Sequence, residues 1–172
     1  MPDSLSIHLR FAFSTSSNSD MRTLQVYSQE NGQETELYKF YHPITGLSIG
    51  LTTVQRRNPN TEIYETACEI EWKNETNATV SFGVEQVNLR DLRKPKKNSS
   101  QSRRFKAGGS EYKWKVAENN KDLFCVDTRG KTLAEWNEEQ QSLKVAKRLE
   151  GVLDRVVVTC LLNLWMKRKG DW

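Results

Sequence analysis

The chain has 172 residues, of which 36% are hydrophobic and 28% are charged, and it includes five Trp, five Tyr and six Phe. This composition excludes a disordered chain, and the length suits one domain with a substantial core. Residues 1–20 contain no secretory signal or inserted anchor, so we expect an intracellular, cytoplasmic protein. The three cysteines are too widely spaced for a disulfide framework or a zinc site, and we expect buried thiols. They are Cys68, Cys125 and Cys160.

Residues 1–20 are predicted to form a flexible N-terminal leader. A short apolar patch from Leu9 to Phe13 is followed by the serine-rich stretch STSSNSD. Serine-rich segments near a chain terminus are commonly mobile. We therefore place a single domain at residues 21–172.

Short runs in which apolar and polar residues alternate follow the leader and predict half-buried strands. The clearest run ends at residue 72, where Cys68, Ile70 and Trp72 share one face and glutamates share the other. Turn signals such as Gly108-Gly109 separate the runs and predict hairpins. The predicted strands lie within 24–27, 37–41, 47–54, 63–72, 78–84, 105–116, 122–126, 131–136 and 142–149. A short amphipathic helix over 138–149 is the alternative for the last run.

The segment 152–166 breaks this alternation because apolar residues fall on every side of it. Its apolar length of about 15 residues is short of the roughly 20 that a membrane-spanning helix needs. A helix that is apolar all round belongs in the centre of a domain, so we predict a core helix at 152–168. The β-branched run 156–159 leaves a buried strand as the alternative.

Many short strands followed by one apolar C-terminal helix resemble the tubby C-terminal-like fold of tubby proteins, phospholipid scramblases and LURP-one-related proteins. More closely, the chain resembles an uncharacterised fungal domain family of that superfamily. The matching pieces are TLQVYSQENGQETELYKF (23–40), EIEW (69–72), FKAGGSEYKWKV (105–116) and LDRVVVTCLLNLWMKRK (153–169). The resemblance implies a mostly β fold, with an antiparallel closed β-barrel around a central hydrophobic C-terminal α-helix. Members of the superfamily bind phosphoinositides or move phospholipids, but none of their ligand motifs matches here residue by residue.

Positive charge is concentrated in residues 90–106, which we call the basic segment. It holds eight basic residues and one acid, a formal charge of +7, whereas the whole chain carries +4 and the remainder therefore −3. Such a cluster attracts phosphate-bearing partners. The candidate anionic-ligand-binding residues are Arg90, Arg93, Lys94, Lys96, Lys97, Arg103, Arg104 and Lys106. A solvated loop between two strands is the plainer interpretation, which Pro95 favours.

The sequence has no arrangement typical of an enzyme active site. His8 lies in the predicted leader and His42 in a turn, and neither is placed beside a Cys or Ser. The glutamates Glu65, Glu69 and Glu71 predict a solvated strand face, because one strand offers few converging oxygens to a metal. We expect no catalytic residue, no metal and no cofactor.

We expect a non-enzymatic binding module that docks on anionic phospholipid or phosphoinositide through the basic segment, as a peripheral membrane protein without a transmembrane segment. The second hypothesis is a protein-interaction or scaffold domain that uses an exposed strand edge. Nucleic-acid contact or nuclear import is less favoured, because the nearby aromatic residues alternate as core residues do. An enzyme with a cavity in the barrel that holds His42 is the third hypothesis.

Overall fold

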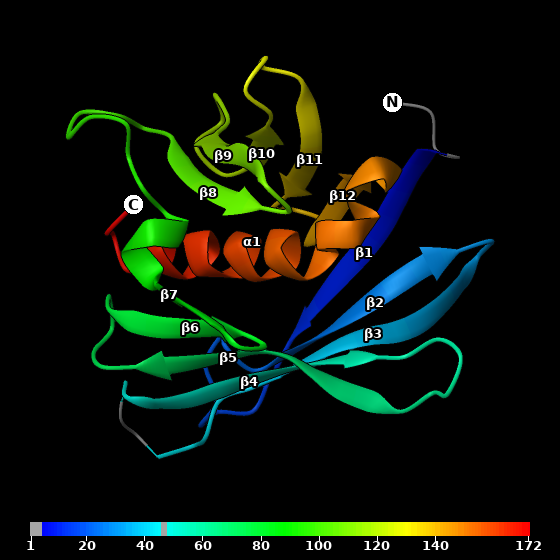
Figure 1. Ribbon diagram of the computed structural model, residues 1–172. Coiled ribbons are helices and arrows are strands. Elements are labelled where there is room, and N and C mark those ends of the chain that lie inside the picture. The colour runs from blue at the N-terminus through cyan, green and yellow to red at the C-terminus, as the bar shows by residue number, and fades with distance from the viewer. Residues whose placement is uncertain (1–4, 46–47) are drawn as a thin grey trace.

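Twelve strands form one antiparallel sheet in the computed structural model, which describes residues 5–45 and 48–172 (Figure 1). The order across the sheet is β7-β6-β5-β4-β3-β2-β1-β12-β11-β10-β9-β8. Two meanders, β1 to β7 and β8 to β12, therefore join where β1 pairs with β12. The strands are β1 (Ser6–Phe13), β2 (Leu24–Glu30), β3 (Gln33–Tyr41), β4 (Gly50–Arg57), β5 (Tyr64–Trp72), β6 (Ala78–Phe82), β7 (Glu85–Asn88), β8 (Arg103–Ala107), β9 (Ser110–Val116), β10 (Leu123–Val126), β11 (Thr132–Asn137) and β12 (Ser142–Ala146).

Strand β5 shows how the alternating pattern positions a strand. Cys68, Ile70 and Trp72 are buried, while the glutamates between them are exposed. Ile70 pairs with Thr52 of β4 and with Val80 of β6, both of them buried. Since successive side chains point to opposite faces, this register gives one apolar face toward the core and one wet face.

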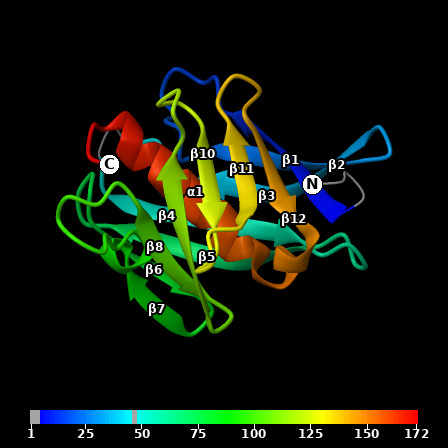
Figure 2. The same ribbon diagram turned by 90° about the horizontal axis from the view of Figure 1, so that it is seen from above.

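The helix α1 (Leu153–Arg168) lies between the two meanders, and its axis crosses their strands (Figures 1 and 2). Every residue from Val156 to Met166 is buried, so the helix is enclosed on all sides. The prediction of a core helix is confirmed, and the alternative of a buried strand is wrong. A 3-10 helix, η3 (Lys147–Val152), links β12 to α1 in place of the alternative amphipathic helix over 138–149. In the described part of the chain, no helix has the length and hydropathy to cross a membrane.

The prediction of a flexible leader over residues 1–20 is wrong for residues 6–13. Strand β1 pairs with β2 on one side and with β12 on the other, so it lies in the middle of the sheet. Leu9 and Phe11 are buried in the core. The apolar residues of this segment thus form the buried face of a strand, and hydrogen bonds to β2 and β12 fix that strand on both sides.

The closure of the sheet into a barrel is not detected. The sheet ends at β7 and β8, and no ladder joins these two strands within the described residues. A 3-10 helix, η2 (Leu89–Leu92), lies between them, and one isolated bridge joins Lys94 to Arg104 of β8. We call the gap between β7 and β8 the seam.

Two predicted runs end differently from the structure. The run 78–84 continues as far as Phe82, after which Gly83 adopts a positive φ of 62° and the chain turns back into β7. Val84 in this turn is fully exposed. Because Val84 is apolar, the alternating pattern wrongly extended the predicted strand to residue 84. The run 47–54 forms β4 only from Gly50 onward, and Leu47 lies outside the described residues.

Candidate functional site

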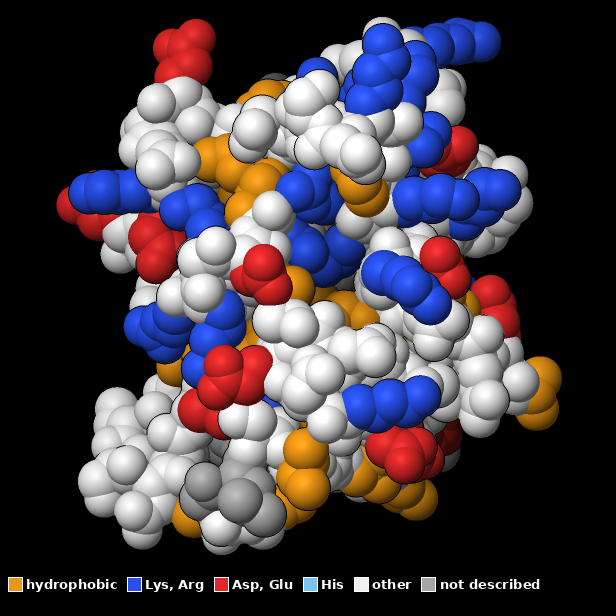
Figure 3. Space-filling view, turned by 90° about the vertical axis from the view of Figure 1, so that its left-hand side faces the viewer, with side chains coloured by type: hydrophobic (Ala, Val, Ile, Leu, Met, Phe, Trp, Pro, Cys, Tyr) orange, Lys and Arg blue, Asp and Glu red, His pale blue; other side chains and the backbone are white. Residues whose placement is uncertain are grey.

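The eight basic residues of the basic segment do not form one mobile loop. Arg90 belongs to η2, whereas Arg103, Arg104 and Lys106 belong to β8. Figure 3 views the molecule from the end where α1 finishes, and Lys and Arg side chains gather on the upper half of that face. The structure therefore holds the positive charge on two ordered elements and the connection between them.

Five of the eight side chains are free to meet a ligand. All five are exposed, and within residues 5–45 and 48–172 none has a hydrogen-bonding or ion-pairing partner for its side chain. These are Arg90, Lys94, Lys96, Lys97 and Lys106. Their charges are uncompensated, as electrostatic docking requires.

Arg93 has a different environment, because it is only 7% exposed. Its Nε donates a 2.6 Å hydrogen bond to Oδ1 of Asn163 in the core helix, while its Nη2 is buried without a partner. Burial and the nearby charge of Arg103 lower the pKa of the Arg93 guanidinium to about 10. Arg93 remains charged at neutral pH and ties the basic segment to α1.

The indole of Trp172 lies against the same segment. The guanidinium carbons of Arg93 and Arg103 are 5.4 Å and 5.6 Å from its ring centroid, which is within cation–π range. Its Nε1 donates a 2.8 Å hydrogen bond to the carbonyl oxygen of Gln101. Arg103 also donates to the carbonyl of Ser100 at 2.8 Å. Arg93 and Arg103 are therefore engaged within the protein.

A pocket of about 380 Å³ opens at the seam. Val87, Leu92 and Phe105 form its apolar floor, and the acids Glu85, Asp91 and Glu111 line it together with four basic side chains. Ion pairs hold two of these, since Arg104 lies 3.2 Å from Glu111 and Arg155 of the helix lies 2.5 Å from Glu85. Lys94 and Lys106 at this pocket keep free ammonium groups. Three of the eight basic residues thus line a concave surface, which the sequence pattern did not predict.

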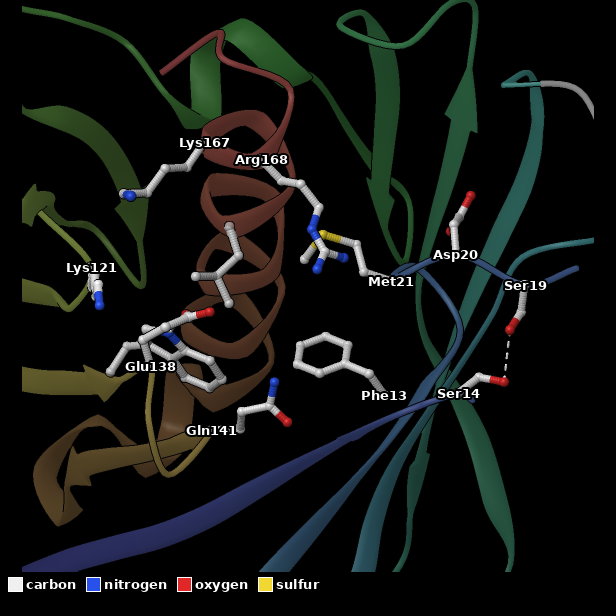
Figure 4. A pocket seen from close by; sticks show the side chains of 12 residues that line it. Phe13, Ser14, Ser19, Asp20, Met21, Lys121, Glu138, Gln141, Lys167 and Arg168 are labelled. Atoms are coloured by element: carbon white, nitrogen blue, oxygen red, sulfur yellow. Dashed lines mark hydrogen bonds between the residues drawn. The ribbon is translucent and has the colours of Figure 1, made fainter. Parts of the chain in front are cut away.

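A larger pocket of about 570 Å³ lies beside the last turn of α1 (Figure 4). Phe13 of β1, Met21 and the helix residue Leu164 supply apolar walls. Arg168 points into the space beside Met21, and Lys121 lies on its other side. We call this the mouth pocket. The sequence did not indicate it, because its walls come from segments more than a hundred residues apart.

His42 is buried, at 4% exposure, in a polar cluster under the β3–β4 connection. Its Nδ1 lies 2.8 Å from the hydroxyl of Thr52, which also accepts a 2.9 Å hydrogen bond from Nε1 of Trp72. Burial, and then the charge of Arg22, lower the pKa of His42. Its Nε2 has no partner in the described structure. The second histidine, His8, lies in β1 and not in a leader.

The cysteines are all buried thiols, as predicted, and burial raises the pKa of each. Such thiols are poor nucleophiles, because the thiolate is the reactive form. Glu65, Glu69 and Glu71 are exposed on β5. Among the residues that the structure describes, no group of three or more His, Cys, Asp or Glu side chains could hold a metal ion.

The model of a family of unknown function matches residues 17–170 of the chain. The match begins after β1 and includes the strands β2 to β12, the basic segment and the core helix. Neither curated proteins nor solved structures gave a match.

Proposed function

The chain belongs to DUF6593, a family of unknown function, so its function has to be argued from its geometry. We propose that the protein is a non-enzymatic binding module that docks reversibly on anionic phospholipid through the basic segment. In this proposal the protein is cytoplasmic and peripheral to the membrane. Its ligand is the phosphate-rich surface of the lipid, with phosphoinositide head groups as the most highly charged form.

The observation that carries the proposal is the set of five exposed, unpaired cations on η2, β8 and their connection. A basic residue near an anionic membrane surface contributes about 1 kcal/mol. Five such residues contribute about 5 kcal/mol together, which suits reversible recruitment and not permanent anchoring. The seam pocket supports the phosphoinositide version, because Lys94 and Lys106 flank an apolar floor that a sugar ring can contact.

We also propose that the fold is tubby C-terminal-like. The supporting observations are a single antiparallel sheet, two meanders and a C-terminal helix enclosed between them. An experimental structure tests this in two ways: by its superposition on that fold, and by whether β7 and β8 are hydrogen-bonded to each other at the seam. Backbone pairing between β7 and β8 would support a closed barrel, and a solvent-filled gap between the two strands would contradict it.

Vesicle co-sedimentation tests the docking proposal. We expect the protein to pellet with vesicles of phosphatidylcholine and phosphatidylserine, more strongly when phosphoinositide is added, and not with phosphatidylcholine alone. Changing Arg90, Lys96 and Lys97 to Ser removes three free cations, or about 3 kcal/mol, so the affinity is expected to fall about 100-fold.

The matched control removes the same charge elsewhere. Arg129, Lys131 and Lys147 are exposed and have no side-chain partner in the described structure. They lie near η3, at the other end of α1, as the Arg148–Asp127 ion pair of 3.1 Å indicates. Changing these three to Ser is expected to leave pelleting almost intact. Equal losses for the two variants would refute docking through the basic segment.

The outer edges of β7 and β8, along which no ladder runs in the described residues, favour a second candidate, a protein-interaction domain that adds an extended peptide to a strand edge. Main-chain hydrogen bonds depend little on ionic strength, whereas electrostatic docking weakens as salt is raised. A partner retained at high salt would favour this second candidate.

A further inference from the structure

We infer that the mouth pocket binds a single-chain amphiphile with an anionic head group, a ligand distinct from the membrane surface of the proposed function. Its volume of about 570 Å³ lies in the range typical of small-molecule sites. It opens beside the last turn of α1 (Figure 4), and it shares no lining residue with the seam pocket.

The apolar side of the pocket suits a hydrocarbon chain. Met21, Trp136 and Leu164 line it and are almost wholly buried, so their sides form fixed walls. Phe13 is half-buried, packs against Phe11 and faces the space between Gln141 and Arg168 in Figure 4. A hydrocarbon chain placed here would remove its own apolar surface and the exposed part of Phe13 from water, at about 25 cal/mol for each Å² buried.

The charged side of the pocket selects the sign of the head group. Three of its five charged side chains are engaged: Asp20 accepts from Arg22 at 2.6 Å, Glu138 from Trp136 at 2.8 Å, and the Lys167 ammonium donates to the Asn120 carbonyl at 2.6 Å. The other two, Lys121 and Arg168, have no side-chain partner in the part of the chain described. Both free charges are positive.

Arg168 is not needed to complete the end of the helix. The final carbonyl groups of α1 accept backbone hydrogen bonds from residues 169–171, at 2.9 to 3.1 Å. The guanidinium is therefore available to a ligand and points into the pocket beside Met21 (Figure 4). A carboxylate or phosphate there would form charge-assisted hydrogen bonds with it, and Lys121 would add attraction from the rim.

Isothermal titration calorimetry with defined amphiphiles tests the inference. We expect dodecanoate and dodecyl phosphate, below their micellar concentrations, to bind saturably, and the tighter of the two identifies the head group. We expect dodecan-1-ol to bind at least ten-fold more weakly and dodecylammonium and butanoate not to bind.

Two substitutions separate the roles of head and tail. Arg168→Gln is expected to weaken dodecanoate binding at least ten-fold and to leave dodecan-1-ol binding unchanged, because it removes only the charge. Phe13→Ser is expected to weaken both, and its thermal unfolding curve reports whether the fold is kept. Arg129→Gln, an exposed arginine at the other end of α1, is the matched control and should bind as the wild type does.

The inference is overturned if the wild type shows no saturable binding of either anion, if dodecan-1-ol binds as tightly as dodecanoate, or if Arg168→Gln retains wild-type affinity. The variant in which Arg90, Lys96 and Lys97 are changed to Ser is expected to bind dodecanoate as the wild type does. A failure of vesicle docking and a failure of the mouth pocket are thus separate results.

Discussion

At the scale of single residues, polar side chains within the core are joined into a chain of hydrogen bonds. The Trp114 Nε1 donates to the Thr159 hydroxyl at 2.9 Å, and that hydroxyl donates to the Arg155 carbonyl at 2.6 Å. Asn163 donates to the Thr159 carbonyl at 2.9 Å and accepts from Arg93. Because buried polar groups are costly when unpaired, this chain specifies the rotation of the helix and the position of Arg93.

Asn163→Leu is expected to destabilise the protein by about 3 kcal/mol, because it leaves a buried guanidinium without its partner. Changing Arg93 to Met in the same chain removes the unpaired charge and should restore much of the loss. Urea unfolding of both variants measures this, with Asn98→Leu on the exposed connection as control. Equal stability of Asn163→Leu and the control would contradict the role of this bond.

His42 makes stability depend on pH. Its pKa in the folded state lies below the ordinary value of 6.5, so the unfolded state binds the proton more readily. The contribution of neutral His42 to the free energy of unfolding is present above pH 6.5 and is lost as the pH falls from 6.5 through the lowered pKa of the folded state. His42→Asn, which keeps an atom near the Thr52 hydroxyl, is expected to flatten the change in unfolding free energy between about pH 7 and about pH 5.

The groups around His42 are Arg22, Asp20, the backbone of Ile49 and the hydroxyl of Thr52, which also accepts from Trp72. Asp20 has a pKa lowered by its bonds to Arg22 against the cost of burial, and it titrates below this window. Chemical denaturation across that range is the measurement. An unchanged slope in the variant would assign the pH dependence to another group.

At the scale of elements, the helix α1 contributes more buried apolar residues to the core than any strand does. Leu161 and Leu162 are each 1% exposed and lie within the cluster formed with both meanders. Leu161→Ala is expected to lower the free energy of unfolding by about 3 kcal/mol, through lost transfer energy and the cavity left behind. Val84→Ala in the exposed β6–β7 turn should change it by less than about 0.5 kcal/mol. Thermal or denaturant unfolding that showed similar losses for both would contradict the central position of the helix.

At the scale of the whole molecule, the open seam divides the sheet into protected and unprotected parts. The edge strands β7 and β8 have a neighbouring strand on one side only, whereas β1 and β12 are paired on both sides. Hydrogen exchange is expected to be faster at β7 and β8 than at β1 and β12, because local opening breaks fewer contacts there. Equal protection of the four strands would indicate that the seam is closed by pairing.

The seam and the mouth pocket could not be predicted from local patterns. Arg155 gave one signal, since it is charged and directly precedes the apolar run of the helix, and in the structure it lines the seam pocket. Nothing local linked Phe13 to Arg168, or Trp172 to Arg93, because only packing around the helix brings those segments together.

The amino-acid sequence by itself determined the alternation of the strands, the core helix, the burial of the cysteines and the concentration of charge in residues 90–106. These are local properties, set by the period of side chains along the backbone and by composition. Only the tertiary structure decided that β1 belongs to the sheet, that no ladder joins β7 to β8 in the described residues, and which cations are free. Those outcomes depend on contacts between distant segments, which a single sequence does not encode as a local pattern.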